Sequence, residues 1–183
     1  DGQLLNPVLG IGTFCTHTLV HADQAISYDS ALPAPQMSLI GCGVMTGVGA
    51  ALYAAGVKPG TSAAVFGCGG VGLSAIQGAR IGGARMIIAV DTVESKLATA
   101  KELGATHVVD ASSHDPVQGI REITGGGGVE YSFEAIGSKR AAEQSFECID
   151  RGGTATIIGM IPVGTKIELD GPAPALEAFA AAL

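Results

Sequence analysis

Three glycines and one acidic residue in the first half of the chain have the types and spacing needed to bind a nucleotide. Gly67, Gly69 and Gly72 form a G-x-G-x-x-G pattern, and Asp91 follows the last glycine by about twenty residues. Glycine permits backbone angles that a side chain would forbid and lets the chain approach a pyrophosphate closely. The first amides of a helix that starts here would face the phosphates, where the helix dipole favours negative charge. Asp91 could then accept hydrogen bonds from the ribose hydroxyls, so the pattern predicts a dinucleotide site.

The surrounding residues give the pattern its weight, because 28 of the 183 residues are glycine and a chance match is easy. Ala63–Phe66 is an apolar run typical of a buried strand, and Met86–Val90 is a second such run. Between them, Val71–Ile81 carries apolar residues at helical spacing. This order favours a nucleotide-binding fold over the alternative, a glycine-rich turn in another α/β protein.

Strands and helices are expected to alternate from about residue 39 onward. A helix over Gly43–Ala55 comes first, and the predicted strands are Ala63–Phe66, Met86–Val90, His107–Val109, Val129–Phe133 and Thr154–Ile158. The predicted helices between them are Val71–Ile81, Glu94–Leu103, Pro116–Ile123 and Lys139–Ile149.

This alternation predicts an α/β protein with a doubly wound parallel sheet of the Rossmann type and strand order 3-2-1-4-5. A further strand is possible over Thr165–Leu169, and the Ala-rich tail Gly171–Leu183 could begin a helix. The sixth strand usual in such sheets is expected to be truncated or missing. A ligand should lie outside the carboxyl ends of the first and fourth strands, so the loop Glu134–Gly137 should face the same crevice as Gly67–Gly72.

Composition excludes some partners and locations. The net charge is −7 and the pI is near 4.9, which disfavours nucleic acid and anionic membranes. The segment Ser30–Val57 has no charged residue, but its glycines and prolines argue against a membrane-spanning helix. The four cysteines are scattered without a C-x-x-C pair, which favours a reducing compartment and a cytoplasmic protein.

With these residues in view, the chain resembles the zinc-containing medium-chain alcohol dehydrogenases. The resemblance runs from Leu9 to about Leu169 and rests on several motifs in family order. They are Ile40-Gly41-Cys42-Gly43 with Thr46-Gly47, Val65-Phe66-Gly67-Cys68-Gly69-Gly70-Val71-Gly72, Val90-Asp91, Phe133-Glu134-Ala135-Ile136-Gly137 and Ile157-Ile158-Gly159. Within the family, the chain is most similar to the glutathione- or mycothiol-linked formaldehyde dehydrogenases.

The resemblance implies a role for individual residues. Cys42 would be the third protein ligand of the catalytic zinc in the full-length parent, and Gly67, Gly69, Gly70 and Gly72 would form the phosphate loop of an NAD site. Thr46, at the catalytic site, and Val71 match residues that pack against the nicotinamide ring. Asp91 and Lys96 match residues at the adenosine ribose, and Ile136 matches one that covers the adenine. Ile158 and Met160 match the loop whose backbone binds the carboxamide, and Val8 and Leu9 align loosely with residues that border the alcohol pocket.

The resemblance also implies that the chain is one part of a longer enzyme. Residues 1–35 would be a remnant of a catalytic domain with its connector, residues 36–170 the dinucleotide-binding domain, and residues 171–183 a truncated tail. The other zinc ligands would precede Asp1, and a catalytic zinc needs three protein ligands. The segment alone is therefore expected to be inactive, whereas the parent would oxidise or reduce a small alcohol or aldehyde, as a homo-oligomer.

Other interpretations of single residues remain open. Cys42 could be a buried small hydrophobe, Cys68 a reactive thiol at a helix N-terminus, and Asp91 the N-cap of the helix that follows it. His17 and His21 could share a metal only from a favourable strand geometry. Lys96 could be a solvated charge. Asp91, with no cation in Thr92–Glu94, favours NAD over NADP.

Two other function classes compete with the NAD-dependent dehydrogenase. One is a zinc-free medium-chain reductase of the quinone type, which would lack the Cys42 ligand and use NADPH. The other is either a non-catalytic nucleotide-sensing domain or a methyl-transfer domain, although methyltransferases of this fold usually carry an acid where Val65-Phe66 stand.

Overall fold

The computed structural model describes residues 15–29, 31–169 and 179–181. The chain divides into two compact units, Asp1–Ala34 and Pro35–Leu183, which are considered separately. In the first unit, a 3-10 helix, η2 (Ala22–Gln24), is capped by the His21 side chain. Residues 15–20 form no strand and are largely exposed.

A continuous helical segment covers Ala34–Ala54, and all of it except Ala34 belongs to the second unit. It consists of α1 (Ala34–Leu39), a π-type turn η3 (Ile40–Val44), α2 (Met45–Gly49) and a second π-type turn η4 (Ala50–Ala54). Pro35 lies in the first turn, where its missing N–H costs no hydrogen bond. The helix therefore starts nine residues before the predicted Gly43.

Glycines in this segment leave room for a neighbouring helix. A Cβ at Gly47 would collide with the Val71 carbonyl oxygen, and one at Gly78 would lie 2.9 Å from the Ala51 Cβ. The small residues thus let the helix lie close to α3 (Gly70–Ile81). Among the described residues, Ala34–Ala54 is the one helix that is long and apolar enough to span a membrane, judged by length and composition alone. Its 18-residue apolar stretch has a mean hydropathy of 1.5, and 17% of that stretch is buried.

The sheet is parallel throughout and has the order β3-β2-β1-β4-β5-β6. Its strands are β1 (Ser62–Phe66), β2 (Met86–Asp91), β3 (His107–Asp110), β4 (Val129–Glu134), β5 (Ile149–Ile157) and β6 (Phe179–Ala181). The remaining helices are α4 (Glu94–Leu103), α5 (Pro116–Thr124) and α6 (Lys139–Glu147). The predicted order 3-2-1-4-5 is confirmed, and the Rossmann-type fold with it.

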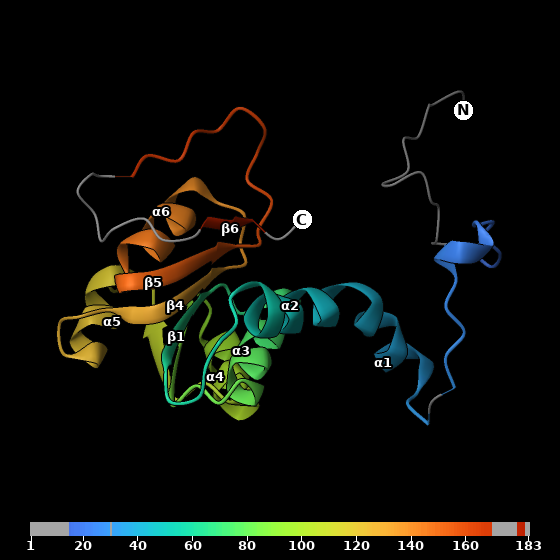
Figure 1. Cartoon of the computed structure of the whole chain (residues 1–183), viewed down its shortest axis with the longest axis horizontal. Helices are drawn as coiled ribbons and strands as arrows, with labels where there is room; N and C mark the ends of the chain where they lie inside the picture. The colour runs from blue at the N-terminus through green and yellow to red at the C-terminus, as the bar shows by residue number, and fades with distance from the viewer. Residues whose placement is uncertain (1–14, 30, 170–178, 182–183) are drawn as a thin grey trace. The chain divides into compact units, whose positions relative to one another are not determined.

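Helices cover both faces of this sheet (Figure 1). On one face, Val65, Ile87 and Ala89 pack with Ile76 of α3 and Leu97 of α4. On the other face, Phe66, Ile88 and Val90 pack with Ile120 of α5 and Phe146 of α6. Alternate residues of the same strands serve opposite faces, which is why these strands appear in the sequence as continuous apolar runs.

The end of the chain adds a strand to the sheet. The sixth strand, expected to be truncated or missing, is present but short, and its residues Phe179–Ala181 pair in parallel with Ala155–Ile157. The possible strand over Thr165–Leu169 does not form; instead Glu168 binds α6, where its N–H donates to Glu143 and its carboxylate accepts from Lys139 at 3.0 Å. The tail helix proposed to start at Gly171 falls mostly outside the described residues, and residues 179–181 are strand.

Candidate functional site

The loop between β1 and α3 has the shape of a phosphate cradle. Gly67 has a φ of +91°, a backbone conformation that L side chains rarely adopt. A Cβ at Gly72 would collide with the Gly67 carbonyl oxygen, so the helix start can lie against the loop only without a side chain there. At Gly69 and Gly70, by contrast, a Cβ would meet nothing within 4 Å. The loop is therefore closely packed at Gly67 and Gly72, and open space lies beside Gly69 and Gly70.

The start of α3 is left without a side-chain cap. Gly69 is the N-cap residue, and no side chain of the described residues accepts a hydrogen bond from the first amides of the helix. These amides are the unpaired donors that bind anions at helix N-termini. The cradle and the donors together can hold a pyrophosphate.

Asp91 at the end of β2 is buried and held on both carboxylate oxygens. Its Oδ2 accepts from the Cys68 N–H at 2.8 Å, and its Oδ1 accepts from the Val93 N–H at 3.0 Å. Lys96 Nζ lies 3.8 Å from Oδ2. The carboxylate thus links the phosphate loop to the end of the neighbouring strand. It also holds the Val93 amide, and Val93 is the N-cap residue at which helix α4 begins.

Glu134 at the end of β4 holds the second loop in a similar way. It is completely buried, and its Oε1 accepts from the amides of Ile136 and Gly137 at 2.9 and 2.7 Å. Its Oε2 has no hydrogen-bond partner among the described residues and lies where a Cβ on Gly159 would approach to 2.5 Å. This role of Glu134 was not predicted, although an acidic residue at the end of an otherwise buried strand was the signal for it in the sequence.

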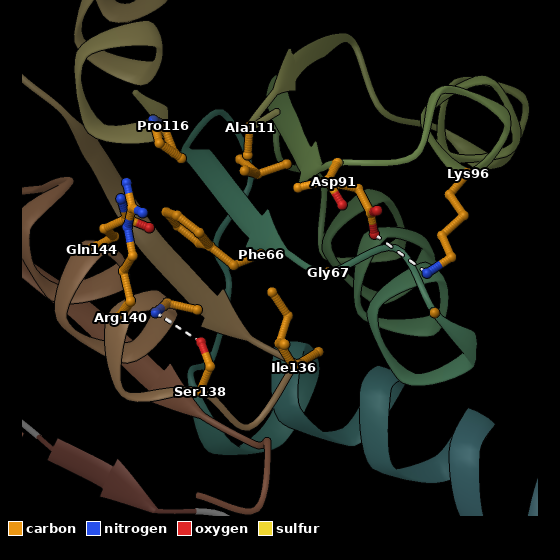
Figure 2. A pocket seen from close by; sticks show the side chains of 15 residues that line it. Phe66, Gly67, Asp91, Lys96, Ala111, Pro116, Ile136, Ser138, Arg140 and Gln144 are labelled. Atoms are coloured by element: carbon orange, nitrogen blue, oxygen red, sulfur yellow. Dashed lines mark hydrogen bonds and ion pairs between the residues drawn. The ribbon is translucent and has the colours of Figure 1, made fainter. Parts of the chain in front are cut away.

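Both loops open into one pocket of about 400 Å³ at the carboxyl ends of β1, β2 and β4 (Figure 2). Five of the predicted cofactor residues line it: Gly67, Gly69, Asp91, Lys96 and Ile136. The sequence did not single out as binding residues several others that line it, among them Phe66, Ala111, Pro116, Arg140 and Gln144. The expected crevice between the loops after the first and fourth strands is therefore present.

Comparison with known proteins then decides the family. The family model of zinc-binding dehydrogenases matches residues 70–177. The chain belongs to this family.

Solved structures of zinc-type dehydrogenases agree with this assignment. An alcohol dehydrogenase zinc-binding domain protein from Burkholderia ambifaria is 43% identical over 84% of this chain and 41% of its own, with a TM-score of 0.79. Benzyl alcohol dehydrogenase from Acinetobacter calcoaceticus is 38% identical over 88% and 44%, with a TM-score of 0.83. A zinc-binding dehydrogenase from Sinorhizobium meliloti 1021 bound to NADP is 33% identical over 70% and 38%, with a TM-score of 0.66. The resemblance to zinc-type alcohol dehydrogenases is confirmed, and the chain spans less than half the length of these relatives.

The remaining predicted cofactor residues lie around the pocket, not in its wall. Gly70, Val71 and Gly72 form the first turn of α3, and the Gly47–Val71 contact brings the segment that holds Thr46 to that turn. Ile158 follows β5 and is half-buried, whereas Met160 is 94% exposed. The Met160 backbone approaches Gly137, so the loop after β5 borders the loop after β4. Val8 and Leu9 lie outside the described residues.

The predicted metal ligand, Cys42, belongs to no group of three or more possible metal ligands among the described residues. Cys42 is exposed in η3 and forms no disulfide, so the interpretation as a buried hydrophobe is wrong. Within the described ranges, no group of three or more His, Cys, Asp or Glu side chains could hold a metal ion. His17 contacts Thr16, and His21 caps η2.

Cys68 lies inside the phosphate loop, but its surroundings keep the thiol protonated. Burial, with the Asp91 charge adding to it, raises the pKa of the Cys68 thiol to about 12. Burial likewise raises the pKa of Cys148. A thiol must lose its proton to act as a nucleophile, so both are expected to be inert at neutral pH.

Thiol labelling checks this expectation. At pH 8, where a thiol of pKa about 12 is ionised to only about one part in ten thousand, Ellman's reagent should modify the exposed Cys42 readily and Cys68 and Cys148 hardly at all. Peptide mass spectrometry would assign the modified positions. In guanidinium chloride, which unfolds the protein, the reagent should modify Cys42, Cys68 and Cys148 alike. Modification of Cys68 in the native protein at the rate of Cys42 would contradict the assignment.

Proposed function

We propose that this chain is the NAD-binding part of a zinc-dependent alcohol or aldehyde dehydrogenase, which transfers a hydride between an alcohol and NAD in a longer protein. One observation carries the proposal: an open glycine loop, an uncapped helix start and a buried strand-end carboxylate converge on one pocket. Each group suits one part of a dinucleotide, namely the pyrophosphate for the loop and helix and the ribose diol for the acid.

Asp91 supports NAD over NADP. Both of its oxygens are held by backbone amides, so the carboxylate cannot turn away to admit a 2′-phosphate. A 2′-phosphate would meet this negative charge at close range. The Lys96 ammonium would offset part of the repulsion, and the Sinorhizobium relative binds NADP, so the preference needs a direct test.

When bound, NAD supplies the chemistry by accepting a hydride at its nicotinamide ring, and this chain's residues position it. We propose that Thr46 and Val71 pack against that ring, and that the backbone around Ile158 and Met160 binds its carboxamide. These segments border the start of α3 and the loop after β4, which fits a ring held beyond the pyrophosphate.

The described residues do not by themselves fit a catalytic zinc. A catalytic site takes three protein ligands and one open position, and Cys42 is the single predicted ligand here. We propose that Cys42 becomes a ligand only together with residues of the longer protein, and that the chain alone does not turn over alcohol. Its exposed side chain in a helical turn is accessible for such a shared site.

The same proposal covers the surroundings of the protein. The substrate would be a small alcohol or aldehyde, the longer protein would be a cytoplasmic homo-oligomer, and neither nucleic acid nor membrane would be a partner. The acidic charge supports the exclusion of nucleic acid.

Calorimetric titration with NADH and NADPH tests the cofactor. NADH should bind about tenfold or more tightly than NADPH, because one unscreened repulsion between the 2′-phosphate and Asp91 is worth at least about 1.4 kcal/mol. ADP-ribose is the control for binding that needs no nicotinamide. Tighter binding of NADPH would overturn the NAD assignment and favour the quinone-type reductase, and absence of binding by both would favour a different function.

A further inference from the structure

Two polar side chains from α6 face the nucleotide pocket without a protein partner. Arg140 and Gln144 are four residues apart, so they lie on the same face of the helix, and both line the pocket. Among the described residues, no group accepts from the Arg140 guanidinium and none pairs with the Gln144 carboxamide. Figure 2 shows the two side chains together on the side of the pocket opposite Asp91 and Lys96.

The rest of the pocket indicates which part of a ligand would reach them. Asp91 and Lys96 mark the ribose side, and between the two sides the walls are apolar, with Phe66, Ala111 and Ile136 (Figure 2). A flat heterocycle attached to a ribose at Asp91 would lie between these walls. Its far edge would then point toward α6.

We propose that Gln144 recognises the 6-amino edge of the adenine base and that Arg140 covers the ring; this rests on the proposed dinucleotide site. A carboxamide offers an acceptor for the 6-amino group and a donor for an adjacent ring nitrogen. Glutamine makes this pair of contacts with adenine in protein–DNA complexes. A planar guanidinium stacks on aromatic faces. Gln144 therefore determines specificity for the base, whereas Arg140 contributes affinity for any purine.

The positions of the two residues suit these different tasks. Gln144 is half-buried in the pocket wall, where a hydrogen bond is partly shielded from water. Arg140 is exposed, one turn closer to the N-terminus of α6, and its long side chain can lie over a ring seated below it. An exposed arginine that is merely solvated would give no change in affinity when it is replaced.

The test compares ADP with purine riboside 5′-diphosphate, which lacks any group at C6. The full chain should bind ADP about three- to tenfold more tightly, the range expected for one or two hydrogen bonds. In Gln144→Leu the two nucleotides should bind equally. Arg140→Met should weaken both by the same factor, about threefold to tenfold, and leave their ratio unchanged.

Matched controls replace the same residue types elsewhere. Gln118→Leu on α5 and Arg151→Met on β5 lie outside this pocket and should leave both affinities unchanged. Titration with NADH separates the two proposals. If NADH binds while ADP and purine riboside 5′-diphosphate bind with equal affinity, or while their affinity ratio is unchanged in Gln144→Leu, the base-recognition proposal is wrong and the dinucleotide site stands. If neither NADH nor ADP binds, the dinucleotide site itself is wrong.

Discussion

Replacing Gly72 with alanine is expected to destabilise the protein and to abolish tight NADH binding together. The new Cβ would collide with the Gly67 carbonyl oxygen and lie 2.9 Å from its carbonyl carbon, both of which are backbone atoms that no rotamer change can move. Either α3 shifts away from the sheet or the phosphate loop deforms. Overpacking of this kind costs about 1–3 kcal/mol, and a deformed cradle loses the aligned amides.

Urea unfolding and NADH calorimetry measure the two effects of Gly72→Ala. Gly70→Ala is the control for stability, because its Cβ would meet nothing within 4 Å and alanine favours the helix. That control should unfold at the same or a higher urea concentration than the parent chain. A Gly72→Ala protein as stable as Gly70→Ala would show that the close packing of the loop is not required.

Replacing Asp91 with alanine should have the second large effect. The buried Cys68 N–H would lose its acceptor, which costs about 1–3 kcal/mol, and the ribose would lose a charged partner. NADH affinity should fall by about tenfold to a hundredfold, the range for losing a hydrogen bond to a charged group. Asp91→Asn keeps an oxygen acceptor for the Cys68 amide, so it should recover most of the stability while its preference for NADH over NADPH narrows.

Asp110 provides a control for the acid at a strand end. It is the register partner of Asp91 on β3, and its hydrogen bonds from Ser112 hold the pKa of its carboxyl below the usual value. Asp110→Ala should leave the affinity for NADH unchanged. Equal losses of affinity in Asp91→Ala and Asp110→Ala would indicate a general effect of the charge at this edge and would refute a specific ribose contact.

The centre of the sheet could be predicted closely because β1 and β2 are nearly continuous apolar runs. The strands beginning at Met86, His107 and Val129 start at the predicted residue. The helix before β1 starts nine residues earlier than predicted, and at Gly47 within it the missing side chain is what permits packing on α3. A glycine can weaken a helix, or it can allow another helix to pack closely against it. Which of the two applies depends on a packing partner that the sequence does not reveal.

The site could be predicted only in part, for a related reason. Gly67, Gly69 and Asp91 belong to a local motif whose spacing alone places them together. Arg140 and Gln144 reach the pocket through the rotation of α6 about its axis, which is set by packing of Phe146 and its neighbours on the sheet. The position of these two polar side chains relative to the ligand is therefore a property of tertiary structure.

The contact of the two loops at Gly67 has a consequence for the energetics of binding. An added Cβ there would lie 2.6 Å from Ile136 Cγ1, so the loops after β1 and β4 already meet, and buried carboxylates fix both to their strands. The site is thus assembled when the protein folds, and little conformational entropy remains to be lost on binding. Folding stability and cofactor affinity then draw on the same contacts, so a bound cofactor would compensate for mutations that loosen either strand end.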